Sequence, residues 1–162
     1  MKHLTWALFL LATCGAVSAQ QHGSHAQTAS PAATLMSGYG DLHHPVSTNN
    51  AEAQKFFDQG LRLIYAFNHE EAAHSFQQAA KLDPKMAMAY WGIAEAVGPN
   101  YNDPADPDRY KQAHDAIQKA GDLAADASPS EKAYIAAMAV RFPADPNADH
   151  RLAAERYRNA IG

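Results

Sequence analysis

The chain has 162 residues, of which 47% are hydrophobic and 19% are charged, and its formal net charge at pH 7 is −4. That length and composition suit one globular domain. The negative charge does not favour a nucleic-acid partner, because surfaces that bind nucleic acid carry an excess of Lys and Arg.

Residues 1–19 have the layout of a secretory signal peptide. A short, weakly positive start precedes an apolar run over residues 4–17, and small residues at 17–19 form a cleavage signal. The run is too short for a helix that spans a membrane. We therefore expect the mature chain to begin near Gln20, to be periplasmic or secreted, and to have no transmembrane segment.

Cys14 is the single cysteine, and it would be removed with the signal peptide. The mature protein would then have neither a disulfide nor thiol chemistry. The sequence from Leu11 to Cys14 also resembles a lipoprotein acylation box, although Thr13 is a poor residue just before the cysteine. A lipid anchor at Cys14 is the alternative to a cleaved, soluble form.

Residues 20–46 follow as a leader that is rich in Gln, Ser, Ala, Gly, Pro and His. This composition and the lack of a helical period favour a flexible segment. From residue 47 to residue 162, apolar residues recur at helical spacing and no period of two indicates a strand. The sequence therefore predicts an all-α domain over residues 47–162.

Six helices are expected in this domain, and capping residues mark their starts. Asn49 with Glu52, and Asn68 with Glu71, have the spacing of capping boxes at the first two helices. The same arrangement recurs at Ser128, before the fifth helix. The expected ranges are about 49–68, 69–83, 85–98, 107–123, 129–141 and 147–161.

Small and aromatic residues recur at fixed places in these helical pairs. In the first pair they are Ala53, Phe56, Gly60, Ala72, Phe76, Ala79 and Pro84. This pattern resembles the tetratricopeptide repeat closely, with Gln59 and Leu63 as departures. The second pair matches in part, because an insertion at residues 98–108 interrupts it, and the third matches weakly. The resemblance covers roughly residues 50–162.

The resemblance implies a right-handed α-solenoid of about three helix-turn-helix hairpins, with a concave face built by the first helix of each pair. Such repeats are scaffolds that bind peptides or other proteins, and they are seldom enzymes. The comparable face here is apolar and aromatic with one acid, so it cannot clamp a terminal carboxylate. The residues expected to contact a partner are Phe57, Leu61, Tyr65, Trp91, Glu95, Asn100, Tyr101 and Asn102. The alternatives are that the face is covered by the protein's own leader, or that these residues are core between helices.

Histidines suggest an alternative function, in which an exported chain binds a metal or a small ligand. His43, His44 and His69 could form a metal site with the loop at residues 98–102, provided that the leader folds back along the first hairpin. His22, third in the predicted mature chain, could bind Cu(II) or Ni(II) with backbone nitrogens. His74 is expected to pair with Glu70 on the surface.

Catalytic motifs are missing from the sequence. It contains no nucleophile elbow, phosphate loop, Cys-x-x-Cys pair or dinucleotide fingerprint, so we expect no enzymatic activity and no cofactor. The chain stops within or just after an amphipathic helix rather than at a polar capping helix, which favours a fragment of a longer protein over a last helix that a partner covers.

Overall fold

The computed structural model describes residues 33–100, 102, 106–145 and 148–162. These residues form α-helices and one short 3-10 helix, without any strand, as the sequence predicts. The predicted signal peptide, Cys14, His22 and Tyr101 lie outside the described residues. The elements are α1 (Ala51–Tyr65), α2 (His69–Leu82), α3 (Ala87–Val97), α4 (Pro107–Leu123), η1 (Ala124–Asp126), α5 (Pro129–Arg141) and α6 (His150–Ile161).

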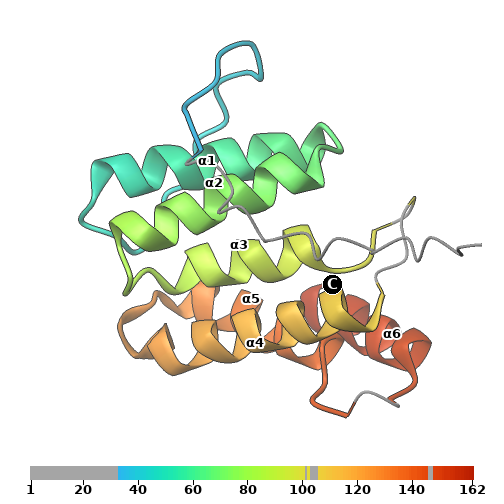
Figure 1. Ribbon diagram of the computed structural model, residues 1–162. Coiled ribbons are helices and arrows are strands. Elements are labelled where there is room, and N and C mark those ends of the chain that lie inside the picture. The colour runs from blue at the N-terminus through green and yellow to red at the C-terminus, as the bar shows by residue number, and fades with distance from the viewer. Residues whose placement is uncertain (1–32, 101, 103–105, 146–147) are drawn as a thin grey trace, which may run out of the picture.

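Each helix packs against the next one in the chain. Figure 1 shows α1 and α2 at one end of the molecule, α3 in the middle, and α5 and α6 at the other end. In addition, α3 contacts both α1 and α5 and lies between them. No helix in the described part of the chain is long and apolar enough to cross a membrane.

The core is centred on Phe76 of α2, whose side chain is fully buried. A Cβ added at Gly60 of α1 would lie 2.6 Å from its ring, and one added at Gly92 of α3 would lie 2.3 Å from it. Both distances are far shorter than van der Waals contact, so both positions need a residue without a side chain. Phe57 packs against the same ring, with 5.5 Å between the ring centroids. The two glycines thus allow α1 and α3 to approach α2 closely.

Side-chain caps define the helix starts. The predicted caps Asn68 and Ser128 are confirmed, and Ser128 forms a complete capping box with Glu131. The prediction of Asn49 is wrong by one residue, because the Asn50 side chain accepts hydrogen bonds from the backbone of α1. Asn50 also donates to the Leu82 carbonyl at 2.9 Å, and this contact with the end of α2 favours Asn50 over its neighbour.

The ends of two other helices differ slightly from the prediction. α6 begins at His150 rather than near residue 147, because the Asp149 carboxylate caps the helix by accepting from the Leu152 amide. α3 covers a shorter range than the predicted 85–98. Differences of this size at helix ends are usual when a boundary is read from local sequence.

Residues 33–48, here called the strap, precede α1 and have no regular secondary structure. Part of the strap forms the blue loop that projects beyond α1 in Figure 1. Ala33, Met36 and Val46 pack against the core, whereas Leu35, Tyr39 and Leu42 are exposed. The strap is therefore attached to the helices at its two ends and projects between them.

Candidate functional site

Side chains of α1 bind the backbone of the strap near its second half. The Asp58 carboxylate accepts from the His44 amide at 3.1 Å and contacts Nδ1 of His43 at 2.7 Å. Gln54 accepts from the Val46 amide at 3.1 Å and donates to the His44 carbonyl at 2.9 Å. Gln54 also donates to Asp58, which holds the two side chains in position. Together they bind the strap backbone at His44 and Val46.

Gln59 binds the first half of the strap in the same manner. Its side-chain oxygen accepts from the Met36 amide at 2.7 Å, and its nitrogen donates to the Thr34 carbonyl at 2.9 Å and to the Ser75 hydroxyl at 3.0 Å. Gln59 is 1% exposed, so these bonds satisfy an amide that would be costly to bury alone. The sequence marks Gln59 as a departure from the repeat pattern, and the structure shows that its side chain binds the strap.

Glu131 connects the strap to α5. Its two carboxylate oxygens accept from the Ser47 amide at 2.7 Å and from the Ser47 hydroxyl at 2.5 Å, and the Ser128 amide donates to it at 2.6 Å. Burial opposes ionisation, but the hydrogen bonds from Ser47 and Ser128 outweigh it and lower the pKa of Glu131 below its usual value of 4.5. The carboxylate is thus held ionised, and the strap reaches from α1 to α5.

The residues predicted to form a partner-binding face have different environments. Phe57 is fully buried, packs against Phe76, and has the His44 ring at 6.3 Å between centroids. It is therefore a core residue and cannot touch a partner in this conformation. Leu61 is half-buried, whereas Tyr65 is 74% exposed at the end of α1.

Trp91 of α3 packs edge-on against Tyr134 of α5, with ring centroids 6.1 Å apart. Trp91 is half-buried and Tyr134 is 45% exposed. The indole Nε1 is buried and has no hydrogen-bond partner within the described ranges. Tyr134 was not identified from the sequence, because its helix matches the repeat pattern only loosely.

Glu95 forms an ion pair with Arg141 of α5 at 2.7 Å. The Arg141 guanidinium also donates to the Pro99 carbonyl at 2.7 Å and lies over the rings of Phe142 and Tyr157. Burial and the nearby Glu95 carboxylate raise the pKa of Tyr157 above its usual value of 10.0. Arg141 is a connection that sequence reasoning missed, since it lies 46 residues from Glu95.

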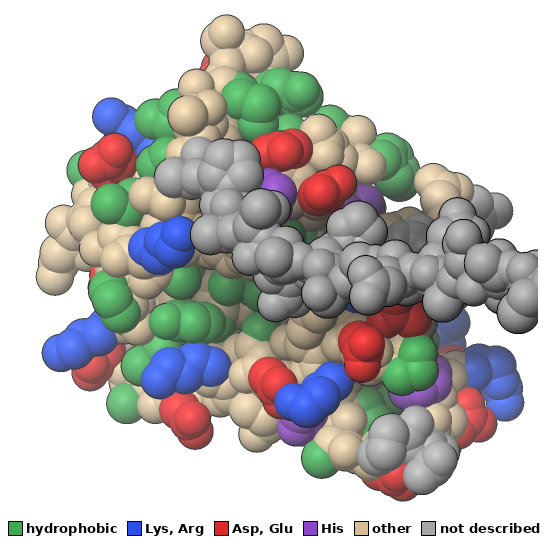
Figure 2. All heavy atoms as spheres, in the orientation of Figure 1, with side chains coloured by type: hydrophobic (Ala, Val, Ile, Leu, Met, Phe, Trp, Pro, Cys, Tyr) green, Lys and Arg blue, Asp and Glu red, His purple; other side chains and the backbone are tan. Residues whose placement is uncertain are grey.

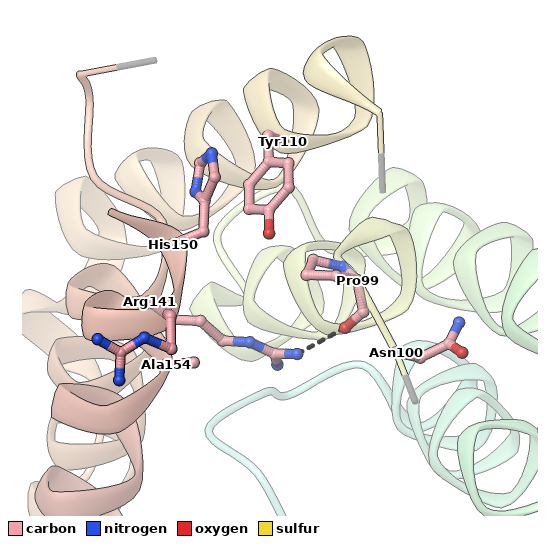
Figure 3. A pocket seen from close by; sticks show the side chains of 7 residues that line it. Pro99, Asn100, Tyr110, Arg141, His150 and Ala154 are labelled. Carbon is pink, nitrogen blue, oxygen red and sulfur yellow. Dashed lines mark hydrogen bonds between the residues drawn. The ribbon is translucent and has the colours of Figure 1, made fainter. Parts of the chain in front are cut away.

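A cavity of about 390 Å³ lies beside this ion pair. Figure 3 shows Arg141 pointing toward Pro99, and the rings of Tyr110 and His150 facing one another; their centroids are 3.9 Å apart. Asn100, which the sequence analysis expects to contact a partner, lines the cavity. Asn102 is exposed.

The histidines are not brought together. His43 and His44 lie on the strap, whereas His69 starts α2, and no three His, Cys, Asp or Glu side chains among the described residues form a group that could hold a metal. Both ring nitrogens of His69 are buried and have no hydrogen-bond partner among the described residues. His69 and His74 line a second cavity of about 340 Å³. His74 contacts Glu71 at 3.6 Å rather than the predicted Glu70.

Acidic and basic side chains are interspersed over the described atoms of the face in Figure 2. This distribution agrees with the modest formal net charge of −4. Comparison with protein-family models, with curated proteins and with solved structures finds no match to this chain.

Proposed function

We propose that this chain is an exported, non-enzymatic scaffold of the tetratricopeptide type, which binds a segment of a partner protein. Helix order supports the solenoid, because each helix packs on the next and α3 also contacts α1 and α5. The packing of Phe76 against Gly60 supports the repeat assignment, since both residues are among those that carry the resemblance. Export rests on the pattern of residues 1–19.

The observation that carries the proposal is the aromatic pair of Trp91 and Tyr134 between α3 and α5. Aromatic side chains that are partly buried, with a polar atom available, are the residues that most often dominate the affinity of an interface. The buried indole N–H of Trp91 has no acceptor within the described ranges. The Tyr134 ring, which is 45% exposed, is the part of the pair that a bound segment can contact. The Glu95–Arg141 pair beside it adds a polar rim.

Replacement of the aromatic pair tests this function. We expect Trp91→Ala and Tyr134→Ala each to weaken partner binding about 30-fold, since a central aromatic residue contributes about 2 kcal/mol. The measurement is quantitative recovery of partners from periplasmic extract by the immobilised chain. Leu152→Ala is the matched control, because Leu152 is 40% exposed on α6, away from the pair. An unchanged partner list for both aromatic variants, with the helical content intact, would refute the proposal.

The alternative, a small-ligand-binding protein, has one observation in its favour. His69 lines the cavity of about 340 Å³ and both its ring nitrogens lack a partner within the described ranges. A metal-binding function has no such support, because His43, His44 and His69 do not form a group that could hold a metal among the described residues. Calorimetric titration with Zn(II), Cu(II) and Ni(II) decides the metal version. Binding tighter than about 10 µM, which corresponds to about 7 kcal/mol, would revive it.

A further inference from the structure

We propose that residues 43–47 of the strap are a built-in ligand that exchanges with a partner segment at a site formed by Gln54, Asp58 and Glu131. The site binds an extended peptide, and the strap occupies it until a competing segment displaces it. This inference rests on the proposed scaffold function. It adds the location of a second region that contacts the partner, the chemistry of the partner segment that binds there, and the way in which the strap regulates that binding.

The site recognises mainly backbone, which makes exchange chemically reasonable. The amides of His44, Val46 and Ser47 and the carbonyl of His44 are all bound by side chains of the helices. Other peptide segments have the same backbone groups and can present them in this way if they adopt the bend that the strap has at Ser47. Recognition of a bound peptide through its main chain, with selectivity from a few side chains, is a common mode of peptide binding.

Two side-chain contacts set the preferred segment. His43 donates from Nδ1 to the Asp58 carboxylate, and the hydroxyl of Ser47, four residues further along the strap, donates to the Glu131 carboxylate. Both receiving groups are carboxylates, so the site favours neutral or cationic segments and disfavours acidic ones. We therefore expect a partner segment with His, Lys or Arg four positions before Ser or Thr.

The strap is built to detach in this region. His43, His44, Pro45 and Ser47 are exposed, and Val46 is the only half-buried apolar side chain of the five. Apart from the packing of Val46 and the contact of the His44 ring with Phe57, little apolar contact is therefore lost when they leave. Gly38 and Gly40, with positive φ of 93° and 83° and no atoms within 4 Å of an added Cβ, provide a hinge in front of the segment.

The two anchors outside this segment remain in place when it leaves. In front of the hinge, the buried Gln59 side chain holds Thr34 and Met36. Behind the segment, the hydroxyl of Thr48 donates to Asp83 at 2.6 Å. Residues 43–47 can therefore leave as a loop while both ends of the strap stay attached.

The position of the segment explains why it would compete with a partner. The His44 ring covers Phe57, a residue of the expected binding face, and Ser47 bridges to α5, which carries Tyr134. A partner segment that extends from the aromatic pair toward α1 would meet the strap. Because the strap is tethered, its effective concentration at the site is of the order of millimolar, so it suppresses weak ligands.

Exchange can be measured with a fluorescent peptide of residues 41–49 and the purified full chain. The variant His43→Ala/Ser47→Ala loosens the strap and leaves Gln54, Asp58 and Glu131 intact. We expect this variant to bind the peptide at least about ten-fold more tightly than the wild-type chain, because its own strap occupies the site for a smaller fraction of the time. A peptide carrying the same two alanines is the matched control and should bind at least about ten-fold more weakly.

Equal affinity of the wild-type and loosened chains for the peptide, with equal circular dichroism, would overturn the proposal. If the loosened chain does not fold, hydrogen exchange of the wild-type chain decides. We expect the amides of His44 and Ser47 to exchange much faster than those of Phe57 and Phe76. If the amides of His44 and Ser47 exchanged only when the whole protein unfolds, the proposal would also be overturned. Neither measurement needs a partner protein. If the Trp91 and Tyr134 variants recover the same partners as the wild-type chain, the scaffold function is refuted, but the result on exchange of the strap still holds.

Discussion

The two ends of the molecule differ in how they are held together. At one end, α1 contains the buried residues Ala53, Phe56, Phe57, Asp58, Gln59, Gly60 and Leu63, and it packs closely on α2. At the other end, Ala153 is the one buried residue of α6. The helices are of similar length, so length does not explain the contrast. The first end therefore has the larger buried core, and α1 also binds the strap through the polar side chains of Gln54, Asp58 and Gln59.

The contrast follows from the repeat pattern. The first pair has most of the small and large residues of the pattern, and Gly60 lets α1 come against Phe76. The third pair has a weaker pattern, and α5 is attached through Arg141 to Glu95 and through Glu131 to Ser47. Polar contacts of this kind direct geometry and add less stability than close apolar packing.

Removal of the central ring gives the largest expected effect. Phe76→Ala should lower the free energy of unfolding by about 3–5 kcal/mol, because it leaves a cavity among three helices. Tyr157→Ala, at the weakly packed end, should cost no more than about 2 kcal/mol, since that side chain is half-buried. Urea denaturation followed by circular dichroism measures both. Equal losses would mean that the two ends are packed alike.

Replacing glycines compares the packing of the same two regions, with a smaller expected change in the free energy of unfolding. Gly92→Ala should destabilise by about 1–3 kcal/mol, because the new Cβ would lie 2.3 Å from the Phe76 ring. Gly121→Ala is the matched control, since nothing lies within 4 Å of its Cβ, and in a helix it should stabilise by up to about 1 kcal/mol. Thermal melts of both variants provide the test. A neutral Gly92→Ala would show that α3 can shift away from α2.

The pH dependence of Glu131 is the smallest expected effect. Its pKa is lowered in the folded state, so its stabilising contribution is complete above its usual value of 4.5 and is lost as pH falls through the lowered pKa. Glu131→Gln should therefore be less stable than wild type at neutral pH, and the two should converge in acid. Urea titrations at several pH values measure this. Glu155→Gln, in a surface pair with Arg151, is the control and should change stability by less than about 0.5 kcal/mol. A constant difference at all pH values would contradict the role of the ionised carboxylate.

The boundaries of the helices were predictable because their determinants are local. Caps such as Asn68 and Ser128 act on amides within the next few residues, so their effect is visible in a short stretch of sequence. The choice between Asn49 and Asn50 was not local. It depends on the carbonyl of Leu82, 32 residues away.

The candidate site was less predictable, because the strap changes the surroundings of residues on α1. Phe57 looked like a binding residue by its place in the repeat, yet packing on Phe76 and coverage by His44 make it core. Asp58 and Gln54 gave no sign of their role, since polar residues on a helix face are usually solvated. Trp91 and its neighbour Tyr90 are both half-buried, although the repeat pattern placed Tyr90 at a core position.

The sequence by itself determined that this chain is helical, where most helices begin, and that Gly60 lies where the first two helices approach each other. These features depend on contacts within a turn or within a short repeat, which periodicity and capping patterns encode directly. Only the tertiary structure decided that the strap lies against α1 and reaches α5. Ser47 and Glu131 are 84 residues apart, and hydrogen bonds over such a separation leave no periodic pattern in the chain.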